Sequence, residues 1–200
     1  MRYFHYTDDQ TELLALRDRK LGDFITKTGH IDRIISDDFF SGLCYNIINQ
    51  QLSMKACDTL WNKITSSLGE ITPETCHDAD RLRSCGLSQS KANCIASCAE
   101  KFISAEIIPS EIPKMSDDEV STLLTSIKGI GRWTAEMTLI FCLERPDVLS
   151  LSDYGIRKGL SVLHDIDIKD IKAMQQYREL YSPYGTIASF YLWEAAKALK

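Results

Sequence analysis

Two glycines, Gly129 and Gly131, restrict the fold of this chain more than any other feature. One aliphatic residue separates them, and amphipathic segments flank them on both sides. Hydrophobic residues such as Leu124 and Ile127 recur there at spacings of three and four, which predicts helices. Glycine tolerates the positive φ that a very short connection between helices requires. We therefore expect a tight helical hairpin in which Ile130 packs inward.

Helical signals continue along the whole chain, and no run of alternating β-branched residues indicates a sheet. Thr7 and Ser116 each begin a capping box, and Gly69 ends an amphipathic stretch. The predicted class is therefore all-α. We expect helices within residues 7–29, 40–50, 53–69, 72–86, 88–102, 116–129, 132–143, 154–163, 168–181 and 185–199, with a connector bounded by prolines at 108–113.

The composition predicts one globular protein without a bound transition metal. Hydrophobic residues make up 44% of the 200 residues, enough to bury a substantial core. The seven cysteines form an odd set without a Cys-x-x-Cys pair, and the four histidines are scattered, so we expect reduced thiols and no metal site. No window approaches the roughly 18 apolar residues of a membrane span, so we expect an intracellular location without membrane association.

The overall charge is acidic, whereas the glycine pair has basic neighbours. The net charge is −5 and the pI is near 5.4, which argues against a protein that derives its affinity from many phosphate contacts. Basic residues nevertheless gather locally, and a basic face on an acidic body remains compatible with the sequence. These residues are Arg81, Arg83, Lys91, Lys128, Arg132, Arg157 and Lys158.

The glycine pair has two interpretations. It is compatible with an ordinary tight turn, because a short motif does not by itself define a function. Without side chains at the two glycines, however, backbone N–H groups at the start of the next helix can approach a phosphate, where the helix dipole also favours negative charge. In that interpretation the phosphate-binding residues are Lys128, Gly129, Ile130, Gly131 and Arg132.

Residues 123–135 and 152–157 resemble the signature of the helix-hairpin-helix (HhH-GPD) DNA glycosylases, in the branch similar to 3-methyladenine DNA glycosylase II. Further similar segments extend the resemblance over about residues 38–193. It implies one all-α, two-lobed domain over 1–200 with the active site in the cleft between the lobes. Lobe A would comprise about 1–37 plus 150–200, and lobe B about 38–149, including the hairpin at 127–135.

The resemblance makes Asp153 the catalytic residue. Asp153 lies twenty residues after Trp133, as in that branch of the family. A carboxylate near a helix N-terminus is held ionised and can stabilise the oxocarbenium-like sugar that forms when a glycosidic bond breaks. Aspartate is also a common N-cap, and the two roles can coexist.

Trp133 indicates a monofunctional enzyme. Relatives that also cut the DNA strand carry a lysine at this position, and without that amine no Schiff base forms there. Those relatives often bind an iron–sulfur cluster through C-terminal cysteines, whereas no cysteine follows Cys142, so we expect no such cluster. The indole suits a flipped, cationic, alkylated purine, and the resemblance adds Phe40 and Met137 to the base pocket. The alternative for Trp133 is core packing.

The segment around Gln51 resembles the part of the family that fills the gap left by a flipped nucleotide. Gln51 matches the wedge position, with Leu52 next to it. A wedge prevents collapse of the emptied stack. The alternative is a polar junction between two helices, capped by Ser53.

The function predicted from these features is hydrolysis of the N-glycosidic bond of alkylated purines, such as 3-methyladenine and 7-methylguanine, in duplex DNA during base excision repair. We expect a monomer that acts on DNA containing damaged bases, in the cytoplasm and nucleoid or in a nucleus. The resemblance implies no cofactor other than a structural Na⁺ or K⁺ at the hairpin carbonyls. Two alternatives remain: a non-catalytic DNA-binding module, which the acidic composition favours, and a glycosylase for uracil or an oxidised purine.

Overall fold

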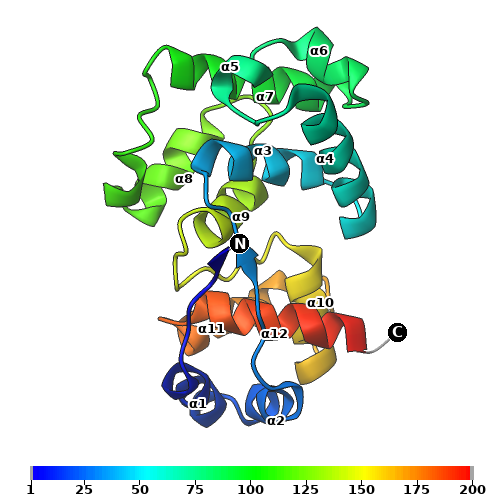
Figure 1. Ribbon diagram of the computed structural model, residues 1–200. Coiled ribbons are helices and arrows are strands. Elements are labelled where there is room, and N and C mark those ends of the chain that lie inside the picture. The colour runs from blue at the N-terminus through cyan, green and yellow to red at the C-terminus, as the bar shows by residue number, and fades with distance from the viewer. Residues whose placement is uncertain (1, 199–200) are drawn as a thin grey trace. The chain divides into compact units, whose positions relative to one another are not determined.

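The computed structural model describes residues 2–198 and confirms the all-α class (Figure 1). Within these residues the regular structure is helical apart from one pair of two-residue strands. The chain divides into two compact units. Unit 1 contains the described residues up to Ile35 and from Glu144 onward, and unit 2 contains Ser36–Leu143.

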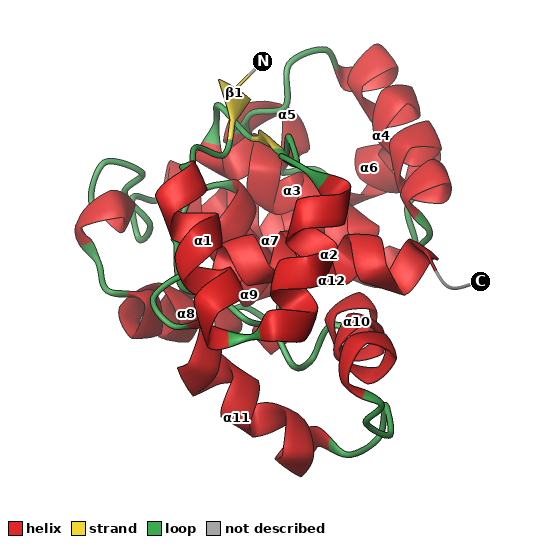
Figure 2. Cartoon of the chain, turned by 90° about the horizontal axis from the view of Figure 1, so that it is seen from below, coloured by secondary structure: helices red, strands yellow, loops and turns green. Residues whose placement is uncertain are grey.

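Unit 1 is built around the pairing of α10 with α12, which is close because Gly159 has no side chain. A Cβ at Gly159 would lie 2.2 Å from the carbonyl oxygen of Leu192. Helices α1 and α2 lie side by side (Figure 2). The elements of unit 1 are β1 (Arg2–Tyr3), α1 (Asp8–Arg17), α2 (Arg19–Thr28), β2 (Ile34–Ile35), α10 (Tyr154–His164), α11 (Ile171–Tyr181) and α12 (Gly185–Ala198).

Unit 2 is built around α7 and the pair α3 and α9. Helix α7 packs against α5 and α6, while α9 packs against α3 and α8 (Figure 1). The elements of unit 2 are α3 (Phe39–Asn49), α4 (Met54–Leu68), α5 (Pro73–Cys76), α6 (Ala79–Ser84), α7 (Gln89–Ile103), the 3₁₀ helix η1 (Ile112–Lys114), α8 (Asp117–Thr125) and α9 (Arg132–Phe141).

Capping signals located several helix ends correctly. The hydroxyls of Ser53, Ser88 and Ser116 accept backbone N–H groups in the first turns of α4, α7 and α8. Gly69 ends α4 at a φ of 78°. Within 72–86, by contrast, the structure has two short helices, because Asp78 caps a new helix six residues after Thr72 caps α5.

Further expectations need correction, and one falls on a residue outside those that the structure describes. The helix expected from 168 begins at Ile171, because Asp170 accepts the N–H of Ala173 and so acts as its N-cap. The short antiparallel pair of β1 and β2, in which Arg2 pairs with Ile35, had no sequence signal. The last helix was expected to include Leu199, which lies outside the described residues.

The region from 7 to 29 contains two helices where one was expected, and Asp18 is the reason. The backbone of Asp18 is extended, with φ −138° and ψ 102°, so α1 ends there. Its carboxylate then accepts the N–H groups of Lys20 and Leu21 and caps α2.

The carboxylate of Asp18 also joins a buried network in unit 1. The Tyr181 hydroxyl donates to Oδ2 of Asp18 at 2.6 Å, and Nε2 of His164 lies 3.1 Å from the same oxygen. Burial alone would raise the pKa of Asp18, but the hydrogen bonds from His164, Tyr181 and the Leu21 N–H outweigh it and lower the pKa to about 2. The ionised carboxylate of Asp18 therefore connects α2, α10 and α11 through hydrogen bonds.

Three further observations concern the described residues as a whole. All the cysteines are free and buried. No helix in the described range is long and apolar enough to cross a membrane. Between residues 2 and 198, no three His, Cys, Asp or Glu side chains are grouped so that they could hold a metal ion.

We expect Asp18→Asn to lower the free energy of unfolding at neutral pH by about 2 kcal/mol, because hydrogen bonds to a buried charge are lost. The folded pKa lies below the ordinary value of 3.8, so this stabilisation is present above pH 3.8 and disappears as the pH falls through 2. Urea unfolding at several pH values measures the difference between wild type and variant. Asp23→Asn, an exposed change on α2, is the control, and a difference independent of pH would contradict the network.

Candidate functional site

The glycine pair forms the tight helical hairpin that the sequence predicted. Helix α8 ends at Thr125 and α9 begins at Arg132, with Gly131 as N-cap. The N–H of Ile130 donates to the carbonyl of Ile127 at 3.0 Å, which closes the turn. Ile130 is buried at 5% exposure. The turn is therefore anchored by its aliphatic residue while its glycines lie at the surface.

The two glycines serve different purposes. Gly129 has a φ of 101°, and a Cβ there would lie 2.9 Å from the sulfur of Cys94 on α7. Gly131 has an ordinary negative φ, and a Cβ there would meet nothing within 4 Å. Gly129 is therefore required by the fold, whereas Gly131 leaves open space above the start of α9, where N–H groups of the first turn lie.

The basic residues beside the hairpin differ in how freely their side chains can reach an external anion such as a phosphate. Lys128 is exposed. The Arg132 side chain is 72% exposed, but its Nε donates to the buried carboxylate of Glu136 at 2.8 Å. Lys91 is only partly exposed, and its ammonium donates to backbone carbonyls. Of these three, Lys91 is the least available to an external anion.

The aromatic and sulfur side chains assigned to a base pocket all belong to unit 2. Trp133 is partly buried in the first turn of α9, and Met137 follows one helical turn later at 3% exposure. Phe40 on α3 is 4% exposed and packs edge-on against Phe102, with ring centroids 5.2 Å apart. Core packing accounts for Phe40 and Met137 in this structure, and their pocket role stays a prediction.

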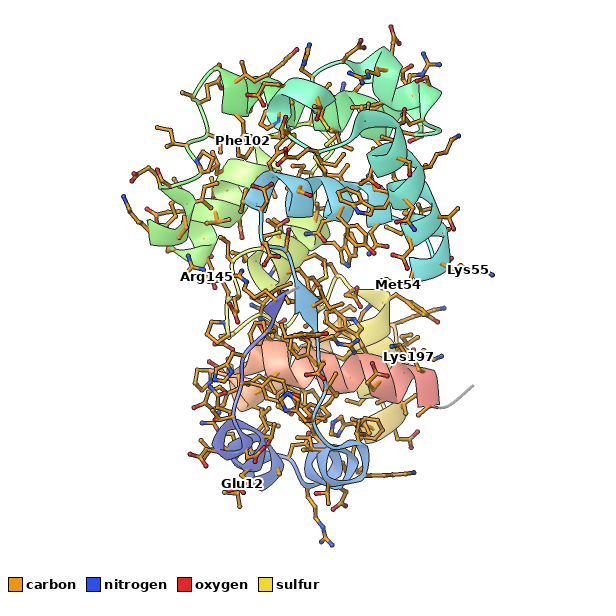
Figure 3. The ribbon with its side chains drawn as sticks, in the orientation of Figure 1. Glu12, Met54, Lys55, Phe102, Arg145 and Lys197 are labelled. Carbon is orange, nitrogen blue, oxygen red and sulfur yellow. The ribbon has the colours of Figure 1, made fainter. Side chains whose placement is uncertain are left out.

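The turn between α3 and α4, residues 50–53, presents the two residues assigned to the wedge. Gln51 is exposed and adopts a φ of 57°, which is unusual for a residue with a side chain. Leu52 is 37% exposed. Beyond the turn, Met54 is 60% exposed, and Lys55 extends away from the ribbon at the start of α4 (Figure 3). The turn therefore offers a polar and an apolar side chain at a constrained backbone.

Gln50, which sequence reasoning passed over, joins this turn to the hairpin. Its side-chain amide donates to the carbonyl of Gly129 at 3.0 Å and to the hydroxyl of Thr134 at 2.9 Å. Lys91 contacts the same turn from α7, with its ammonium 2.7 Å from the carbonyl of Ile48 and 2.8 Å from that of Gln50. The turn at 50–53 and the hairpin are thus linked by direct hydrogen bonds.

Asp153 is the N-cap of α10 in unit 1. Its Oδ1 accepts the backbone N–H of Ile156 at 2.9 Å. The same oxygen accepts the indole N–H of Trp193, on α12, also at 2.9 Å. The capping role considered from the sequence is therefore confirmed, and a second donor from a distant part of the chain holds the carboxylate.

The surroundings of Trp193 keep the indole in place against Asp153. A Cβ at Gly155 would lie 2.8 Å from Cδ1 of Trp193, so glycine leaves room for the ring. The Trp193 ring stacks on Phe190 at a centroid distance of 6.1 Å. The guanidinium of Arg33 lies over the Trp193 ring, 5.9 Å from its centroid, and forms an ion pair with Glu194. The sequence showed Trp193 only as part of a similar segment.

The comparisons with known proteins show the family to which the chain belongs. Residues 44–183 match the HhH-GPD superfamily of base excision DNA repair proteins, and the chain belongs to that family. It is 40% identical over 159 residues to DNA-3-methyladenine glycosylase 1 of Schizosaccharomyces pombe, a match that spans 76% of this chain and 69% of that protein.

Two solved structures extend the likeness to nearly the whole chain. One is the S. pombe 3-methyladenine DNA glycosylase in complex with abasic DNA, with a TM-score of 0.86 and 31% identity over 94% of this chain and 97% of that one. The other is a DNA-3-methyladenine glycosidase from Bacillus halodurans, with a TM-score of 0.82 and 33% identity over 98% of this chain and 93% of that one. The predicted family and glycosylase fold are confirmed.

We expect Gly129→Ala to destabilise unit 2 by about 2 kcal/mol, because alanine is strained at positive φ and its Cβ would press on Cys94. Gly131→Ala should change stability by no more than about 0.5 kcal/mol. Thermal unfolding of both variants measures the contrast. Adding Cys94→Ala to Gly129→Ala should recover part of the loss, and equal effects of the two glycine substitutions would contradict the assigned roles.

Proposed function

We propose that the protein is a monofunctional DNA glycosylase that hydrolyses the N-glycosidic bond of alkylated purines in duplex DNA. The observation that carries the proposal is the carboxylate of Asp153, held by the N–H groups of Ile156 and Trp193 in a chain of this family. The names of the relatives, DNA-3-methyladenine glycosylases, supply the substrate class.

The chemistry assigned to Asp153 is electrostatic. As the bond between base and sugar breaks, the electron pair leaves with the base and positive charge develops on the sugar. A fixed carboxylate stabilises that charge and orients a water molecule, whose oxygen bonds to the sugar carbon while its proton is released. An alkylated purine that carries a positive charge becomes neutral on leaving, so it needs little further assistance.

The proposal assigns DNA binding to the hairpin and the turn at 50–53. Backbone N–H groups in the first turn of α9, next to Gly131, bind a DNA phosphate, and Lys128 and Arg132 add positive charge beside it. Gln51 and Leu52 enter the stack that the flipped nucleotide leaves. Trp133 faces the base and, because it is not an amine, forms no Schiff base with the sugar.

A structural Na⁺ or K⁺ at the hairpin carbonyls remains part of the proposal. The carbonyl of Gly129 accepts a hydrogen bond from the side-chain amide of Gln50. The carbonyl of Ile127 accepts the N–H of Ile130. Each backbone carbonyl oxygen has two lone pairs, so these hydrogen bonds leave both carbonyls able to bind a cation as well.

Two other functions lead to different outcomes in one assay. A glycosylase for uracil or an oxidised purine would release those bases and leave methylated purines in place. A non-catalytic DNA-binding module would release none, although it would bind duplex DNA. The Trp193 bond to Asp153 favours an enzyme, because an N-cap does not require a second donor from another helix.

We expect wild-type protein to release free methylated bases from alkylated duplex DNA, with strands intact until alkali is added. Asp153→Asn should lower the rate at least about a hundredfold, because the negative charge is lost. Folding and DNA binding should persist, since the asparagine oxygen can still accept both N–H groups. Asp170→Asn, at the N-cap of α11 in the same unit, is the matched control. Full activity of Asp153→Asn would disprove the role of this carboxylate.

Trp193→Phe should lower kcat about ten- to a hundredfold, because one hydrogen bond to a charged group contributes roughly 1.5–3 kcal/mol and phenylalanine has no N–H donor. KM should stay close to the wild-type value, since a ring still stacks on Phe190. Trp61→Phe, on α4, is the control for replacing a tryptophan. In an Asp153→Asn background the Trp193 substitution should have no further effect, and an additive loss would mean that Trp193 acts on something other than Asp153.

A further inference from the structure

Lys91 and Gln50 form a continuous set of hydrogen bonds that the proposed chemistry does not use. The Lys91 ammonium donates to the carbonyls of Ile48 and Gln50 at the end of α3. The Gln50 side chain donates to Gly129 and Thr134, in the hairpin and the first turn of α9. Three separate stretches of sequence therefore meet in unit 2 through four hydrogen bonds.

The charge of Lys91 is directed inward. Carbonyls at the C-terminal end of a helix lack partners within the helix and carry partial negative charge, so a cation there is favourable. Desolvation lowers the pKa of Lys91, as expected for an ammonium partly withdrawn from water. With two carbonyls within 2.8 Å, this side chain is engaged in holding the backbone.

Helix α7 contacts the hairpin independently of Lys91. Cys94 lies three residues after Lys91, on the same face of α7, and its sulfur would be 2.9 Å from a Cβ at Gly129. One face of α7 therefore supports both the turn at 50–53 and the hairpin. Neither turn can shift along α7 without losing hydrogen bonds or packing.

We propose that Lys91 and Gln50 are positioning residues. They fix the distance between the hairpin, which binds a DNA phosphate, and Gln51 and Leu52, which enter the base stack. The proposal rests on the proposed function, in which those two turns bind DNA. A side chain can fill the correct gap in a base stack only if it enters at a set distance from the gripped phosphate. Lys91 supplies that distance through the backbone and makes no phosphate contact.

The first test compares Lys91→Met with Lys101→Met. Lys101 lies near the other end of α7 and pairs with the exposed Glu106, so both variants lose one positive charge from the same helix. A fluorescent base analogue next to an abasic site brightens when it is unstacked, and so reports insertion whether or not the protein releases a base. We expect the brightening to fall at least tenfold in Lys91→Met and to stay at the wild-type level in Lys101→Met.

The salt dependence of binding to undamaged duplex separates positioning from a phosphate contact. Loss of a lysine that binds phosphate reduces the slope of log K against log salt by about 1, whereas loss of Lys91 should leave the slope unchanged. Lys128→Met, which removes a proposed phosphate contact, serves as the positive control. A reduced slope in Lys91→Met would overturn the proposal and make Lys91 a phosphate ligand.

Gln50→Leu is the second variant, and it leaves the Lys91 ammonium in place. It should reproduce the loss of insertion, and the double variant should lose no more than the stronger single one, because both act through one network. Circular dichroism and thermal unfolding establish that each variant is folded. Normal insertion by folded Gln50→Leu would overturn the proposal.

Failure of the proposed function gives a separate pattern. If wild-type protein inserts beside an abasic site but releases no methylated base, the glycosylase assignment fails and the positioning proposal stands. If wild-type protein releases the base but the fluorescence of the analogue does not rise, residues of the turn at 50–53 do not enter the base stack. The positioning proposal then fails as well.

Discussion

The close approach of Gly129 to Cys94 is the constraint on which unit 2 depends. The hairpin needs a positive φ at this residue, and α7 leaves no space for a side chain. With the backbone pressed against α7, the carbonyl of Gly129 comes within reach of Gln50, and the turn at 50–53 is held in turn. The close contact between the backbone at Gly129 and α7 thus determines where the hairpin carbonyl meets Gln50, because a packed interior leaves little room for adjustment.

Asp153 shows how one carboxylate can serve the fold and the proposed chemistry together. The hydrogen bond that caps α10 orients Oδ1 of Asp153, and the indole N–H of Trp193 on α12 donates to the same oxygen. The close packing of α10 on α12 at Gly159 brings the two helices near enough for that bond. Preorganisation of this kind is what electrostatic stabilisation requires, because a group that is already oriented need not reorganise during the reaction.

The interactions of the basic residues near the hairpin explain how a protein with a net negative charge can bind DNA. Arg132 is shared with Glu136, and Lys91 is engaged with carbonyls, so the lysines and arginines do not simply form a charged face. A protein that holds phosphate through backbone N–H groups needs fewer cations than one that covers the duplex with lysines. The net charge of −5 is therefore compatible with the proposed function.

Local sequence signals determined much of the secondary structure and the identity of the central motif. Serine and threonine caps, glycine ends and the glycine pair act over a few residues, so they can be recognised in the chain itself. Asp18 ends α1 and begins α2, but the helical periodicity on both sides of it made the region look like one helix in the sequence. The family and Asp153 as the catalytic candidate came from the resemblance of residues 123–135 and 152–157 to the helix-hairpin-helix signature.

Only the tertiary structure showed the partners of those residues. Trp193 lies forty residues from Asp153, Lys91 forty-one from Gln50, and Gln50 seventy-nine from Gly129. No periodicity or cap records such contacts, because they depend on how helices pack and not on neighbours in the chain. Sequence by itself thus identified the residues proposed to meet DNA, and the packing of α7 and α12 decided how they are held, since a hydrogen bond forms only where folding brings donor and acceptor within about 3 Å.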